Sequence, residues 1–84
     1  MEEKEIGTVT HYFSHLGVAA IQLQGELRVG DTIRIKGHTT DFQQSVESMQ
    51  IEHEFVQQAG AGQNIGIRVV EHTREHDHVY KLVG

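Results

Sequence analysis

The chain has 84 residues, a formal net charge of −5, and neither cysteine nor proline. This length allows one domain with a small core, and the lack of cysteine excludes disulfides and thiolate metal sites. The acidic balance argues against unselective attraction to nucleic-acid phosphates, so DNA is not an expected partner. The charged segment 1–5 is unlike a signal peptide and no apolar run could span a bilayer, so we expect a cytoplasmic protein with no membrane partner.

Apolar and polar residues alternate along most of the chain, which predicts β-strands and no long helix. The expected strands cover residues 6–13, 16–23, 31–37, 44–54, 64–70 and 78–83. Gly30-Asp31 and Gly62-Gln63 supply turn chemistry, since glycine reaches positive φ without steric cost. Six short strands with glycine-containing turns indicate an all-β fold, and we expect residues 1–84 to form one closed antiparallel barrel.

The same alternation predicts the core. In the second expected strand one set of alternate residues is Ala19, Ile21 and Leu23, and the opposite face carries Val18, Ala20 and Gln22. The residues expected in the barrel core are Val9, Ile21, Leu23, Ile33, Ile35, Met49, Ile51, Ile65, Ile67, Val69 and Leu82.

The fourth expected strand, 44–54, contains an irregularity. Val46 falls one step out of phase with Met49 and Ile51, so a two-residue period cannot bury all three. We therefore predict a β-bulge near Glu47-Ser48. The alternative is that Val46 faces solvent.

Two stretches carry a resemblance to a known family. Residues 27–37 and 61–69 each contain a turn with glycine that is followed by alternating isoleucines. They resemble the second-domain β-barrel of translational GTPases such as elongation factor Tu, over nearly the whole chain. Residues 37–42 and 46–51 look closer to the carboxy-terminal accessory barrel of collagenase-like peptidases associated with tRNA modification. The resemblance implies a six-stranded closed Greek-key barrel of the translation-protein type, without a GTPase domain.

The loop after the third expected strand is the most unusual segment. His38, Thr39, Thr40 and Asp41 present hydrogen-bond donors and acceptors beside the ring of Phe42, a surface suited to a base or ribose. The elongation-factor resemblance implies that this side holds the aminoacylated end of tRNA, although the loop matches only in position. The alternative is that the polar residues bond local backbone and Phe42 caps the barrel.

A basic stripe is the second candidate contact surface. Arg34 and Lys36 project from the third expected strand and Arg68 from the fifth. If these strands are close around the barrel, the three charges would reach a phosphate backbone. Ordinary cross-strand pairing with glutamates is the alternative, and the one we favour.

Residues 71–78 combine three imidazoles with three carboxylates, which are enough ligands for zinc or nickel. No separate cluster completes a rigid site, so we favour a solvated charged loop and expect no metal and no cofactor. The glycines at 60 and 62 are not followed by the lysine and helix of a nucleotide cradle. The chain has no Gly-x-Ser-x-Gly elbow and no cysteine nucleophile, so we expect no enzyme activity.

The leading hypothesis is a noncatalytic, translation-factor-like binding module that contacts RNA, such as tRNA or ribosomal RNA, or a tRNA-modifying enzyme. Its expected contact residues are His38, Thr39, Thr40, Asp41, Phe42, Arg34, Lys36 and Arg68. The alternative is a protein–protein adaptor that acts in trans on a partner enzyme without RNA contact, which the acidic charge favours.

Overall fold

The computed structural model describes residues 2–83, and every regular element in that range is a β-strand. The strands are β1 (Glu2–Phe13), β2 (Val18–Leu23), β3 (Leu27–Arg28), β4 (Thr32–Lys36), β5 (Asp41–Ser45), β6 (Met49–Ile51), β7 (Glu54–Phe55), β8 (Gln58–Ala59), β9 (Asn64–Arg68) and β10 (His78–Val83). All pairs are antiparallel, which confirms the all-β antiparallel prediction. Within residues 2–83 no helix has the length and apolar character needed to cross a membrane.

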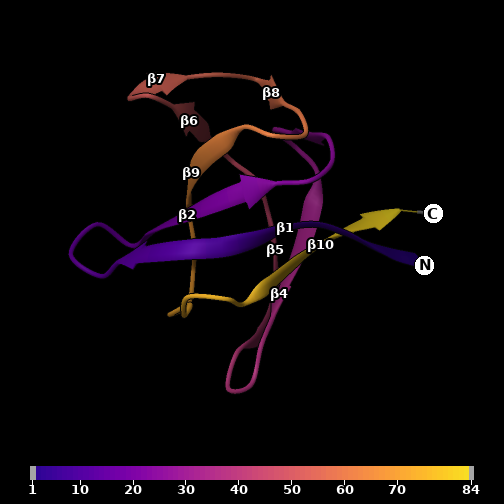
Figure 1. The fold of residues 1–84 in the computed structure, drawn as a ribbon, viewed down its shortest axis with the longest axis vertical. Coiled ribbons are helices and arrows are strands. Elements are labelled where there is room, and N and C mark those ends of the chain that lie inside the picture. Colours follow the sequence, from indigo (N-terminus) through magenta and orange to yellow (C-terminus); the bar gives the residue numbers. More distant parts are fainter. Residues whose placement is uncertain (1, 84) are drawn as a thin grey trace.

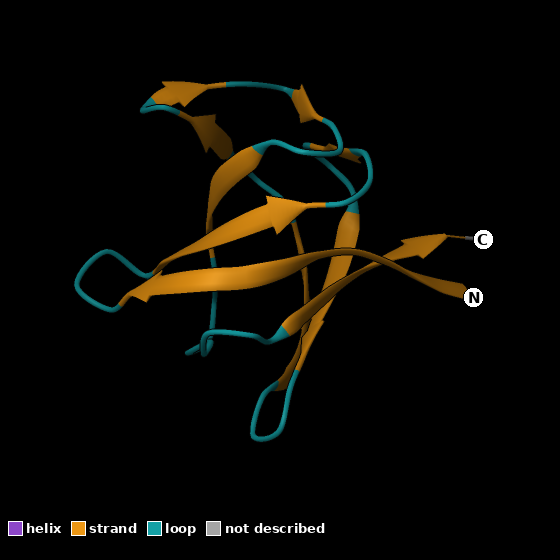
Figure 2. Cartoon of the chain, in the orientation of Figure 1, coloured by secondary structure: helices purple, strands orange, loops and turns teal. Residues whose placement is uncertain are grey.

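The strands form one large curled sheet and one small pair. The large sheet has eight strands in the order β5-β4-β10-β1-β2-β9-β6-β7, and β3 pairs with β8 (Figure 1). Figure 2 shows β1 and β10 running side by side toward the two chain ends, as their ladder requires. The six-stranded closed Greek-key barrel is not found, because β5 and β7 end the order and do not pair within the described range.

A side chain bridges part of the gap that the ladder leaves open. Gln44 on β5 donates from Nε2 to the Arg68 carbonyl, and its Oε1 accepts from the Val70 N–H, both at 2.8 Å. Gln44 pairs in register with Ile33, so its side chain lies on the concave face with that buried isoleucine. One amide therefore does what a short stretch of ladder would do in a closed barrel.

The concave face holds the core. Nine of the predicted core residues are buried, while Ile51 and Leu82 are only partly buried. Seven further hydrophobic residues complete the cluster: Ile6, Ala19, Leu27, Phe42, Val46, Ala59 and Val79. Strict alternation along β2, β4 and β9 explains this result, since each strand sends every second side chain inward.

The predicted strand 44–54 is two strands and a turn. β5 begins earlier, at Asp41, and ends at Ser45, and β6 begins at Met49. Val46 lies between them, is 1% exposed, and its backbone bonds Gly30 and Asp31. The phase change that suggested a bulge at Glu47-Ser48 is thus an interruption of the ladder, and the alternative of a solvent-facing Val46 is wrong.

Candidate docking surface

The predicted contact loop is a compact turn. The Gly37 N–H donates to the Thr40 carbonyl at 2.7 Å, which closes the turn between β4 and β5. Thr40 and Phe42 are buried, whereas His38 and Thr39 are exposed at the tip. Phe42 belongs to the core, so the loop does not present the phenyl ring to a ligand. A contact role for this loop stays a prediction.

Asp41 is engaged by a cation on the neighbouring strand. Arg34 donates from Nε and Nη2 to the two carboxylate oxygens of Asp41, both at 2.8 Å, and from Nη1 to Glu3 at 2.9 Å. The hydrogen bonds from Arg34 hold the pKa of Asp41 below its usual range, and the same bonds raise the pKa of the guanidinium. Both Asp41 oxygens accept a hydrogen bond from Arg34.

The predicted basic stripe is spread over two strands that are not paired. Arg34 and Lys36 lie on β4 and Arg68 lies on β9. Along the ladder β10, β1 and β2 separate these strands, whereas on the other side only β5 lies between them, and its Gln44 bonds the Arg68 carbonyl. Arg34 is also neutralised by Glu3 and Asp41. The favoured interpretation of the sequence, cross-strand pairing with acidic residues, describes Arg34 well.

The side chains of residues 71–78, the histidine-rich loop, contact separate partners. His78 lies 2.7 Å from Glu5, and the ring of His72 stacks edge-on against Tyr12 with centroids 4.5 Å apart. Glu75 faces His11 at 3.5 Å. Within residues 2–83 no group of three or more potential ligands is arranged to hold a metal ion.

The feature that sequence reasoning missed is an apolar patch on the convex face of β1 and β2. The β1–β2 register shifts between Val9 and His11, so that Phe13 pairs with Val18 and lies on the face opposite the core. Without this irregularity the two-residue period would place Phe13 on the same face as buried Val9. A bulge commonly re-aims side chains in this way.

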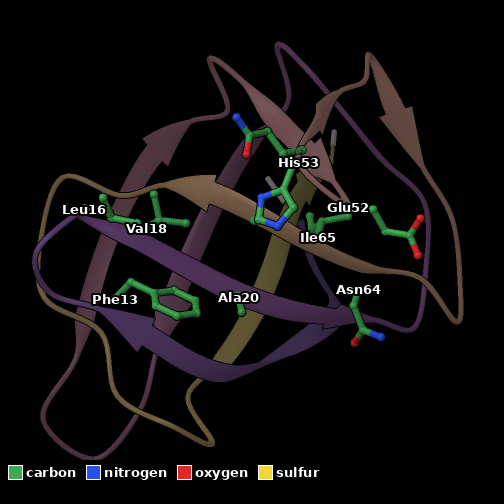
Figure 3. A pocket seen from close by; sticks show the side chains of 10 residues that line it. Phe13, Leu16, Val18, Ala20, Glu52, His53, Asn64 and Ile65 are labelled. Atoms are coloured by element: carbon green, nitrogen blue, oxygen red, sulfur yellow. The ribbon is translucent and has the colours of Figure 1, made fainter.

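These residues line a groove of about 360 Å³, which we call the apolar groove. Its apolar lining consists of Phe13, Leu16, Val18, Ala20, Ile65 and Gly66. Glu52 and His53, from the turn between β6 and β7, lie on the opposite side (Figure 3). Figure 3 also shows Asn64 at one end of the groove and Ala20 near its centre.

Exposure marks this groove as unusual. Phe13 is 44% exposed and Leu16 is 64% exposed. Phe55, 71% exposed, lines an adjoining groove that shares Val18 and Gly66 with the first. The convex face of a sheet normally carries polar residues toward water, and these exposed apolar side chains depart from that pattern.

Part of this signal is visible in the sequence. Val18 and Ala20 share the face opposite the core with Gln22, so the first half of β2 is apolar on both sides. Two apolar faces on one strand predict that both are covered. The contribution of Phe13 could not be read from the sequence, because it depends on the bulge.

Comparison with known proteins finds segments of longer proteins that are similar to this chain. No family model matches the chain. The chain is 42% identical over 79 residues to an uncharacterized protease of Methanocaldococcus jannaschii, a match that covers 93% of this chain and 19% of that protein. It is also 42% identical over 79 residues to a collagenase of Porphyromonas gingivalis, covering 92% of this chain and 22% of that protein. The chain therefore spans about a fifth of the length of the curated relatives it matches.

A solved structure has the same fold. The C-terminal domain of a Geobacillus thermoleovorans putative U32 peptidase superposes with a TM-score of 0.89 at 22% identity, covering 95% of this chain and 93% of that domain. The selenomethionine variant of that domain gives a TM-score of 0.86 at 22% identity, covering 90% of this chain and 96% of that chain.

These similarities correct the leading functional hypothesis. The resemblance to an accessory barrel of collagenase-like peptidases is supported, and that to the second domain of elongation factor Tu is not. Translation-factor-like RNA binding is wrong as the main function, because the similar proteins are named protease, collagenase and peptidase. No RNA partner is supported, and the adaptor alternative agrees better with the findings.

Proposed function

We propose that this chain is a noncatalytic docking module that binds the catalytic part of a peptidase-type protein through the apolar groove. The observation that carries the proposal is the exposed apolar surface formed by Phe13, Leu16 and Phe55 on the convex face of the sheet. The choice of partner is supported by the relatives, in which a segment similar to this chain makes up 19% to 22% of a longer protease or collagenase.

The size of the apolar surface supports a specific contact. Fully burying one large hydrophobic side chain contributes about 1.5–3 kcal/mol. Phe13, Leu16 and Phe55 are between 44% and 71% exposed. Covering each of them should therefore contribute roughly half to two thirds of that free energy. A few such anchors carry most of the binding energy in protein–protein interfaces.

The charged side chains of the sheet support a structural role in place of catalysis. Arg34 pairs with both Asp41 and Glu3, and His78 faces Glu5. These pairs hold β1, β4, β5 and β10 together. We infer that residues 1–84 act as one folded binding unit.

A reconstitution experiment tests the proposal. The Porphyromonas gingivalis collagenase is prepared without the segment that matches this chain, and the chain is added in trans while binding is followed by calorimetry or interferometry. We expect saturable binding that survives 0.5 M NaCl, because burial of apolar surface is not screened by salt.

Matched variants locate the contact. The double variant Phe13→Ser/Leu16→Ser should weaken binding at least tenfold, while circular dichroism shows an unchanged sheet. Val70→Ser is the control, because Val70 is 72% exposed and lines a different groove. Equal binding by the double variant and the control, or no binding by the native chain, would contradict the proposal.

A further inference from the structure

The turn between β6 and β7 has an unfavourable backbone. Ile51 pairs with Glu54, so Glu52 and His53 form a two-residue hairpin turn. Both have positive φ, 50° at Glu52 and 69° at His53. Turns with positive φ at both central residues strongly prefer Asn-Gly, because larger side chains are strained there. Strained residues of this kind cluster at ligand-binding sites, where their side chains have a role.

The strained turn holds His53 over the apolar groove. Figure 3 shows the imidazole of His53 over the groove and the ring of Phe13 beside Ala20. The carboxylate of Glu52 points away from the centre of the groove (Figure 3). Two rings therefore border a space whose lining is apolar.

The floor between the rings is recessed. Ala20 on β2 pairs in register with Gly66 on β9, so neither residue has a side chain longer than a methyl group. The ring of Phe13 makes an edge contact with His11, with ring centroids 4.4 Å apart and planes at 67°. The shape is a slot with a small-residue floor and an aromatic ring on either side.

We propose that this slot takes one tryptophan or tyrosine side chain of the partner polypeptide, seated on Ala20 and Gly66 between Phe13 and His53. The inference rests on the proposed function and names the anchor that the partner supplies. An aromatic side chain suits two ring walls, because aromatic pairs gain from edge-to-face and offset contacts. A charged side chain does not suit the slot, since no opposite charge points into it.

Asn64 at the end of the groove favours tryptophan or tyrosine over phenylalanine as the bound side chain. Its amide is exposed and offers both a donor and an acceptor. A buried indole N–H or phenol O–H needs such a partner, whereas a phenylalanine ring does not use it.

A small-molecule probe tests the slot without the partner. The ¹⁵N-labelled chain is titrated with N-acetyltryptophanamide, and the amide signals of Ala20 and Gly66 are followed. We expect saturable shifts with a millimolar dissociation constant, and no saturable shifts with N-acetylleucinamide. Ala20→Leu should abolish the shifts by filling the floor, and Val70→Ser should leave them unchanged.

The turn itself provides the sharpest variant. Glu52→Asn/His53→Gly has the sequence that the backbone prefers, so we expect a higher unfolding midpoint. The same variant removes one wall of the slot, so its affinity for N-acetyltryptophanamide should fall at least threefold and its affinity for the shortened collagenase at least tenfold. A more stable variant that binds both as tightly as the native chain would overturn the slot.

The two proposals fail in different ways. Binding of the shortened collagenase without a saturable N-acetyltryptophanamide site overturns the aromatic anchor and leaves docking intact. A saturable N-acetyltryptophanamide site in a chain that does not bind the shortened collagenase overturns the peptidase-type partner, and with it the assignment of the anchor to that partner. Equal affinity for the leucine and tryptophan amides overturns the preference for aromatic side chains.

Discussion

Gln44→Ala should destabilise the fold, because it removes the side chain that joins β5 to the end of β9. The amide of Gln44 makes two hydrogen bonds of 2.8 Å, to the Arg68 carbonyl and from the Val70 N–H. Each hydrogen bond contributes about 0.5–1.5 kcal/mol net. Arg68 and Val70 are exposed, so water satisfies part of what the truncation leaves unpaired. We therefore expect a loss of about 1–2 kcal/mol.

Thermal unfolding measures this loss. For a domain of 60–100 residues, 1 kcal/mol lowers the unfolding midpoint by about 4–8 °C. Gln43→Ala is the matched control, because Gln43 is the exposed neighbour on the same strand and its side chain makes no hydrogen bond within residues 2–83. The control should change stability by less than about 0.5 kcal/mol. If the two variants unfold at the same temperature, Gln44 does not join β5 to the end of β9 in the way we argue.

Three further changes test individual contacts. Thr73→Val should raise the unfolding midpoint by about 4–8 °C, because Thr73 is 1% exposed and its hydroxyl has no partner within the described range; a fall would show that the hydroxyl is bonded. Gly37→Ala should cost about 1–3 kcal/mol in a urea titration, since a Cβ there would collide with the Asp77 carboxylate, and Gly60, which has open space around it and no positive φ, should tolerate the same change. The lowered pKa of Asp41 means that its stabilising contribution is present above an unfolded pKa of about 3.9 and is lost as the pH falls through the folded value. Asp41→Asn should therefore be less stable than the native chain at pH 7 and equally stable in strong acid; a constant difference across that range would exclude the Arg34 pair as the cause.

The concave face could be predicted from the sequence because it depends on strand periodicity alone. Ile33, Ile35, Ile65 and Ile67 alternate with polar residues, and each is buried as predicted. Closure could not be predicted in this way. It depends on whether the edge strands meet, and here the side chain of Gln44 forms the connection in place of a ladder.

The surface that we propose for docking was harder to predict for a related reason. The loop at 37–42 attracted attention because its residues are polar and its length is unusual, yet Thr40 and Phe42 are buried. The apolar groove depends on two local departures from regular geometry: the register shift before His11 and the positive φ angles at Glu52 and His53. Neither the register shift nor the strained turn contains a glycine or proline that would indicate it in the sequence.

The register shift disturbs the pairing of β1 with β2, whereas the strained turn keeps β6 paired with β7. Both departures act on the convex face. The register shift interrupts the β1–β2 ladder and turns Phe13 outward, while the strained turn places His53 across from it. Each lowers the stability of a small domain whose core leaves little margin. Local conflicts between sequence and backbone are expected at functional sites, and both conflicts here border the same Ala20–Gly66 floor. Their convergence on one groove favours a docking role for the convex face of β2 and β9 over the polar loop at 37–42.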